Sequence, residues 1–118
     1  MLSKKQRMSK ALASEVFMHG RIVSSPSYPH FLIKTAQSPE GKTSPTRFAV
    51  SISKKIAPTA VLRNRTRRRV YSVIQNLWPR VVPGLSVAIS VKKGGEKLTY
   101  EEIAKELGRE IEKSAFLK

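Results

Sequence analysis

The chain has 118 residues and carries 23 lysines and arginines against 8 acids, which gives a formal net charge of +15. That length suits one domain and that charge attracts polyanions, while the absence of cysteine excludes disulfides and cysteine-bound metals and fits a reducing cytosol. No run approaches the roughly 20 apolar residues of a membrane span, and MLSKKQRMSK at the N-terminus lacks the apolar stretch of a signal peptide. We expect a soluble cytoplasmic protein with one domain over residues 1–118, including a basic N-terminal arm over residues 1–8.

The first half of the chain predicts one helix and two strands. Leu12 and Val16 recur at helical spacing within residues 10–19, and Gly20 marks the end of this helix. FLIKT, residues 31–35, is rich in branched and aromatic side chains, which is typical of a strand.

RFAVSIS, residues 47–53, alternates apolar with other side chains and predicts a second, half-buried strand. The loop before it, QSPEGKTSPT, contains two prolines and a glycine. The alternation in both strands predicts four core side chains: Phe31, Ile33, Val50 and Ile52.

The C-terminal third predicts a strand and a helix. LSVAISV, residues 85–91, is the strand, and Thr99 with Glu102 matches a capping box that starts a helix over residues 100–115. The inward side of that helix is expected to carry Ile103, Leu107 and Ile111. With the arginine-rich helix described next, the order is α-β-β-α-β-α, so the predicted fold is α+β, a single-domain sandwich of a small mixed sheet with helices.

Residues 63–69, RNRTRRR, belong to the remaining helix and hold five arginines. A helical wheel places one apolar stripe on this helix, made of Leu62, Thr66, Val70, Val73 and Leu77. A solvated basic helix normally interleaves glutamate at i,i+4, but the sequence has no acid between Glu40 and Glu96. This helix therefore favours an external polyanion over a merely solvated face.

The residue types indicate RNA rather than duplex DNA. Arginine binds phosphate bidentately and stacks on bases, and Lys54 and Lys55 extend the basic patch. On this helix only Asn64 and Gln75 could read bases, and the chain shows neither a zinc module nor a heptad repeat. A ribosomal or other structural RNA-binding protein, and more weakly an architectural DNA-binding protein, remain alternatives.

SISKKIAPTAVLRNRTRRR, residues 51–69, resembles the signature of the protein subunit of bacterial ribonuclease P. EVFMHGR at 15–21 is similar to that family's first helix, and LTYEE at 98–102 to the start of its last helix. Three features depart from the family pattern: a spacer one residue longer that contains Pro58, and Ala13 and Lys34 where aromatic side chains are usual.

The resemblance implies an additional short strand, a left-handed βαβ crossover, and a function in the cleavage of precursor tRNA at the mature 5′ end. In that family an RNA subunit with divalent metal, expected to be magnesium, is the catalyst, and the protein assists. The chain alone is expected to bind no cofactor or metal and to contain no catalytic residue. It is also expected to bind neither a membrane nor DNA. The sequence agrees, because it contains no aspartate and His19 and His30 have no evident partner.

The resemblance also implies two binding surfaces on this chain. The first would hold the RNA subunit through Lys54, Lys55, Arg63, Asn64, Arg65, Arg67, Arg68 and, more loosely, Arg69. The second would receive the single-stranded 5′ leader of precursor tRNA in a groove between the first helix and the sheet, with Phe17, Leu32, Lys34 and Ser51 as candidates.

Overall fold

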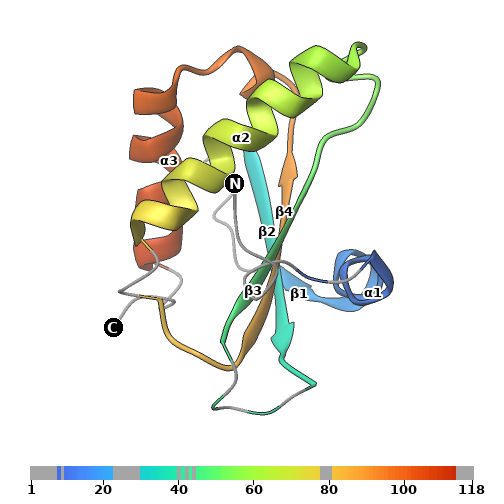
Figure 1. Ribbon diagram of the computed structural model, residues 1–118, viewed down its shortest axis with the longest axis vertical. Coiled ribbons are helices and arrows are strands. Elements are labelled where there is room, and N and C mark those ends of the chain that lie inside the picture. Colours follow the sequence, from blue (N-terminus) through green and yellow to red (C-terminus); the bar gives the residue numbers. More distant parts are fainter. Residues whose placement is uncertain are drawn as a thin grey trace.

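The computed structural model describes residues 8, 10–22, 30–39, 41, 43, 45–77 and 81–113 (Figure 1). The expected arm therefore lies outside the described residues except for Met8, whose N–H donates to the Phe48 carbonyl at 3.1 Å. The elements, in chain order, are α1 Lys10–His19, β1 Arg21–Ile22, β2 Phe31–Gln37, β3 Arg47–Ser51, α2 Ala60–Leu77, β4 Leu85–Val91, the short 3-10 helix η2 Gly95–Lys97 and α3 Tyr100–Lys113.

The four strands form one mixed sheet in the order β1-β2-β4-β3. β2 is antiparallel to both β1 and β4, whereas β3 and β4 run parallel and are joined through α2. β1 is the additional short strand that the resemblance implies. Figure 1 shows α2 and α3 on one side of the sheet and α1 on the other. The predicted α+β sandwich with a mixed sheet is confirmed.

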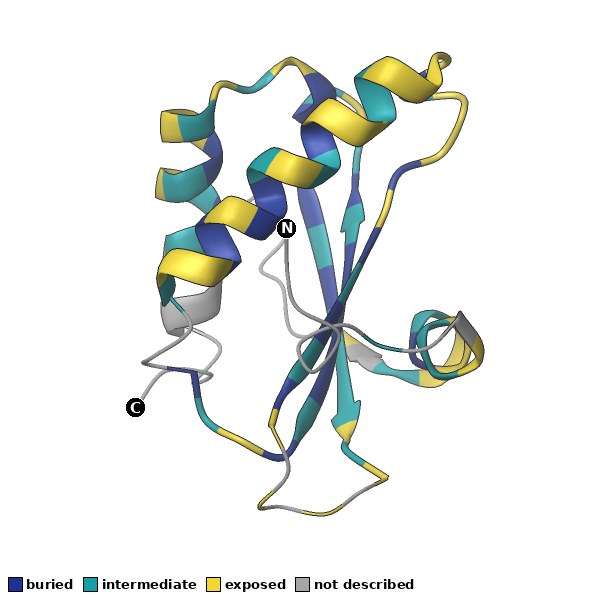
Figure 2. Ribbon diagram, in the orientation of Figure 1, coloured by how far each residue is buried: buried dark blue, intermediate teal, exposed yellow. Residues whose placement is uncertain are grey.

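The core lies between the sheet and the helix pair α2 and α3 (Figure 2). The four side chains predicted to face it from β2 and from the β3 segment, Phe31, Ile33, Val50 and Ile52, are all buried. Ile103 and Leu107 of α3 are fully buried as expected, while the side chain of Ile111 lies outside the described residues.

The predicted bounds hold for α1 and β4, while the ends of β2 and β3 differ from prediction by two residues. The last two residues of the predicted C-terminal helix, 114 and 115, lie outside the described residues. β2 extends to Gln37, whereas β3 ends at Ser51 because the chain turns toward α2. That turn places Pro58 outside the helix, where its missing N–H costs no helical hydrogen bond. Thr59 then caps α2, since its hydroxyl accepts the N–H of Leu62 at 3.1 Å.

The predicted capping box of α3 is present. The N–H of Thr99 donates to the Glu102 carboxylate at 3.0 Å, and the N–H of Glu102 donates to the Thr99 hydroxyl at 3.3 Å. The backbone N–H of Thr99, and next its hydroxyl, lower the pKa of the Glu102 carboxyl.

The lowered pKa of Glu102 predicts a pH-dependent contribution to stability. A carboxyl whose folded pKa is depressed stabilises the fold above its unfolded pKa, and this is lost as the pH falls through the folded pKa. Glu102→Gln should therefore lower the urea midpoint at pH 7, and the difference from wild type should shrink as the pH falls below the ordinary glutamate pKa and through the lowered pKa of Glu102. Glu101→Gln removes a neighbouring charge without breaking the cap; equal losses for both variants at every pH would contradict this role of Glu102.

Candidate nucleic-acid interface

Helix α2 presents one buried and one basic side. Its buried residues are Thr66, Val70, Tyr71, Val73 and Ile74, with Leu62 and Leu77 partly buried against the core. This confirms the predicted stripe and widens it by Tyr71 and Ile74. The hydroxyl of Thr66 donates to the Leu62 carbonyl at 3.0 Å, so its burial leaves no unsatisfied donor.

Four cations of the predicted set are exposed: Arg65 and Arg68 on α2, and Lys54 and Lys55 in the turn before it. Within the part of the chain that the structure describes, none of the four makes a hydrogen bond or an ion pair. Figure 2 shows the exposed residues along the outer side of α2. These side chains keep all their donors for an external anion.

Three other arginines of α2 also make contacts within the protein. Arg63 donates to the carbonyls of Ala57 at 2.8 Å and Pro58 at 3.2 Å, and so holds the turn before the helix. Arg69 donates to the Leu98 carbonyl at 2.7 Å, which ties α2 to the start of α3.

Arg67 donates to the Asn64 side-chain oxygen at 2.9 Å. Each of these contacts uses one nitrogen of a guanidinium that carries five N–H donors. The structure therefore gives Arg63, Arg67 and Arg69 positioning contacts in addition to any external ligand.

No carboxylate neutralises this surface from within the same stretch of chain. The sequence has no acid in residues 41–95, and the next one, Glu96, is only 8 % exposed. Its carboxylate accepts the N–H of Gly94 at 3.0 Å. Among the described residues no carboxylate forms an ion pair with an arginine of α2, so the surface favours a polyanion.

The second predicted surface lies on the sheet face that bears α1. The strand register sets Leu32, Ser90 and Ser51 side by side in one row across β2, β4 and β3. Lys34 lies two residues along β2 from Leu32, and therefore on the same face. Leu32 and Lys34 are half-buried and Ser51 is exposed. Ser90 was not among the residues predicted for this surface, because its position in the middle of the row depends on strand pairing.

Helix α1 approaches this face closely. Lys34 donates from Nζ to the Phe17 carbonyl at 2.6 Å, and Phe17 is half-buried. A Cβ on Gly20 would lie 2.5 Å from the Val16 carbonyl oxygen and 3.1 Å from the Lys34 Cβ, so only glycine fits at the exit of α1. The structure thus brings Lys34 against the main chain of α1 at Phe17, and a role of these residues in leader binding stays a prediction.

A hollow of about 320 Å³ lies between α1 and the end of β2. None of the four predicted leader residues lines it. The residues that do are Leu12, Glu15, Val16, His19, Gly20, Ala36, Gln37 and Pro39.

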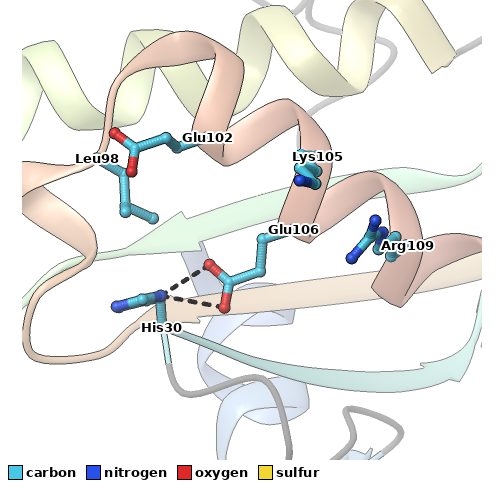
Figure 3. Close-up of a pocket in the computed structure, with 6 residues that line it drawn as sticks. All are labelled: His30, Leu98, Glu102, Lys105, Glu106 and Arg109. Carbon is cyan, nitrogen blue, oxygen red and sulfur yellow. Dashed lines mark hydrogen bonds and ion pairs between the residues drawn. The ribbon is translucent and has the colours of Figure 1, made fainter.

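A second hollow, of about 340 Å³, lies beside α3 and contains His30 (Figure 3). The Nδ1 atom of His30 lies 2.8 Å and 3.1 Å from the two carboxylate oxygens of Glu106. The interpretation that His30 has no partner is therefore wrong, because folding brings a carboxylate 76 residues away against it. This pair links α3 to the residue that precedes β2.

The described residues hold no group of three or more histidine, cysteine or acidic side chains that could bind a metal ion. No helix among them is both long and apolar enough to cross a membrane. The prediction that the chain alone binds no cofactor or metal stays a prediction.

Residues 2–115 match the protein family described as ribonuclease P. The chain belongs to the ribonuclease P family. The ribonuclease P protein component of Microcystis aeruginosa is 37 % identical over 76 residues, which cover 64 % of this chain and 63 % of that protein. The component of Rippkaea orientalis is 34 % identical over 73 residues, 62 % of this chain and 58 % of that protein. Each match thus spans less than two thirds of the relative's length.

Solved ribonuclease P proteins share the fold. The Staphylococcus aureus protein matches with a TM-score of 0.80 at 17 % identity, over 98 % of this chain and 100 % of that one. The Thermotoga maritima protein matches with a TM-score of 0.69 at 14 % identity, over 87 % and 92 %. The resemblance read from the sequence is confirmed for family and fold.

Proposed function

We propose that this protein is the RNA-binding protein subunit of a cytoplasmic ribonuclease P and assists a catalytic RNA in removing the 5′ leader from precursor tRNA. The observation that carries the proposal is the acid-free basic surface of α2, on a chain whose residues 2–115 match the ribonuclease P family. Ribonuclease P is an endoribonuclease, and in this proposal the chain contributes binding rather than bond cleavage.

The RNA subunit would bind the basic surface of α2 and the turn before it. Four exposed cations, Arg65, Arg68, Lys54 and Lys55, donate to no other described residue. They therefore suit phosphates of a folded RNA. Arg63 and Arg69 hold the helix in place through backbone carbonyls and offer their remaining donors.

The single-stranded leader would lie on the sheet face beside α1. Phe17 offers an aromatic ring for a base, and Lys34 offers a positive charge that lies at the Phe17 backbone carbonyl. Leu32 and Ser51 border a flat row of side chains with Ser90 between them. Such a surface suits unpaired nucleotides, whose bases stack while cations follow the backbone.

Groups for acid–base chemistry are scarce in this chain. It contains no aspartate, and His30 is occupied by Glu106. The described residues offer no cluster that fits a resident metal ion, so we derive no step through magnesium held by the protein. When bound in the ribonucleoprotein, magnesium would supply the activation of water and the stabilisation of charge on phosphate.

A structural role in the ribosome is the alternative that the charge alone would also fit. The two functions differ in partner, so binding to a bacterial ribonuclease P RNA and to ribosomal RNA of similar length should be compared at the same salt concentration. Tighter binding to the ribonuclease P RNA supports the proposal, and equal or weaker binding contradicts it.

The leader surface makes a prediction about substrate length. Phe17→Ala should weaken holoenzyme affinity for precursor tRNA by ~1 kcal/mol or somewhat more, the lower end of what one stacked base contributes. Lys34→Ala should weaken it mainly at low salt, because a half-exposed lysine acts as a screened charge. The measurement is affinity for substrates whose leaders are trimmed stepwise.

Met18, which is 74 % exposed beside Phe17 on α1, provides the matched control. Met18→Ala should leave affinity unchanged for every leader length, and circular dichroism should show that all three variants fold. Loss of affinity by Phe17→Ala for leaderless tRNA as well would place Phe17 in the core and not in a leader site.

A further inference from the structure

A third hollow, of about 200 Å³, lies directly on helix α2. Four side chains line it, those of Asn64, Arg67, Arg68 and Tyr71. At roughly 30 Å³ per water molecule, the volume corresponds to about seven waters. It suits one planar heterocycle rather than a folded ligand.

The lining of this hollow consists almost entirely of hydrogen-bond donors. Arg68 is exposed and keeps all five guanidinium N–H groups within the described part of the chain. Arg67 binds the oxygen of the Asn64 amide at 2.9 Å, which leaves the Asn64 amino group to donate to a ligand. Among the described residues, no carboxylate lines the hollow. A ligand held here must present acceptors.

The hollow also has the groups that hold an aromatic ring. Tyr71 is 7 % exposed and belongs to the core, so it closes the hollow on the protein side and leaves stacking to the exposed guanidinium of Arg68. Guanidinium planes and aromatic rings are the surfaces on which unpaired RNA bases stack. A phosphate alone would need only the exposed cations that α2 already offers elsewhere, such as Arg65.

We propose that this hollow binds a single unpaired guanine of the RNA subunit. Guanine presents two adjacent acceptors, O6 and N7, which match the fork of an arginine. On that edge uracil presents O4 alone, whereas adenine and cytosine present amino groups that would oppose the donors of Arg68 and Asn64. The order of affinity is guanine, then uracil, then adenine and cytosine. This inference rests on the proposed binding of α2 to RNA.

The test uses the full chain and four end-labelled pentanucleotides, CCXCC, with X as each of the four bases. Fluorescence anisotropy at one salt concentration should give an affinity for CCGCC about fivefold or more above that for CCCCC, the lower end of what a bidentate pair contributes. Arg68→Lys keeps the charge but removes the fork, and should bring that ratio close to one. Asn64→Ala, at an exposed position, should reduce it as well.

Arg65→Lys is the matched control, because it makes the same chemical change at an exposed residue that does not line the hollow. It should keep the guanine preference. Equal affinity for all four pentanucleotides, or an equal loss of preference in Arg65→Lys and Arg68→Lys, would overturn the proposal.

A parallel titration with ribonuclease P RNA separates this inference from the proposed function. Tight binding to that RNA, with equal affinity for the four pentanucleotides, would contradict the guanine site but not the proposed function. A guanine preference without binding to that RNA would support a guanine site on α2. It would contradict the assignment of that guanine to the RNA subunit, and also the proposed function.

Discussion

Replacement of both Arg65 and Arg68 by alanine should weaken binding of the ribonuclease P RNA by about 15- to 30-fold at 0.15 M salt. Each phosphate contact releases counterions and contributes roughly 0.7 to 0.9 to the slope of log K against log salt. The double variant should therefore also flatten that slope by about 1.4 to 1.8. Both side chains are exposed and make no hydrogen bond or ion pair with other described residues, so the fold should not change.

The matched control removes two positive charges from a different surface. Lys105 and Arg109 are exposed on α3 and line the hollow around His30, where α2 contributes no residue (Figure 3). Lys105→Ala with Arg109→Ala should leave the slope unchanged. If both double variants reduced the slope alike, RNA binding would depend on overall charge and the surface of α2 would have no special role.

Ile74→Ala should destabilise the protein by roughly 2–5 kcal/mol, which is the range for truncating a fully buried aliphatic side chain. Ile74 has no exposed surface and packs in the core beneath α2. Domains of this size have an unfolding free energy of only about 5–15 kcal/mol. Such a loss would therefore remove a large part of the stability that keeps α2 packed on the sheet. Urea denaturation followed by far-ultraviolet circular dichroism measures it.

The neighbouring Gln75 is exposed on the same helix and gives the control. Gln75→Ala should change the unfolding free energy by no more than about 0.5 kcal/mol. A loss below about 1 kcal/mol for Ile74→Ala would mean that the core relaxes around the cavity, and that α2 is held mainly by its polar contacts.

Elements with a local signal were predicted closely from the sequence. α1 and β4 have the predicted bounds, and the Thr99–Glu102 capping box forms the hydrogen bonds that its pattern predicts. Alternation identified the inward side chains of β2 and β3, because successive residues of a strand point to opposite faces.

Features that depend on distant parts of the chain were not predicted. The His30–Glu106 pair joins residues 76 positions apart, and no sequence spacing identifies such a contact. The row of Leu32, Ser90 and Ser51 depends on strand register. Tyr71 was not predicted to be buried, because a helical wheel does not show how much of a helix surface the neighbouring elements cover.

The same limit applies to the binding surface on α2. The sequence singled out its arginines as one group, whereas the structure divides them by what they contact. Arg63 and Arg69 each bind backbone carbonyls, while the side chains of Arg65 and Arg68 make no hydrogen bond or ion pair with other described residues. This division decides which variants test RNA binding and which would also disturb the fold.

Reconstitution at low magnesium concentration is the most direct test of the proposed function. Purified chain, a bacterial ribonuclease P RNA and precursor tRNA are combined, and cleavage is compared with that of the RNA alone and of the chain alone. We expect cleavage at the mature 5′ end only when chain and RNA are present together. A specific cut by the chain without the RNA, or no increase when the chain is added to the RNA, would contradict the account.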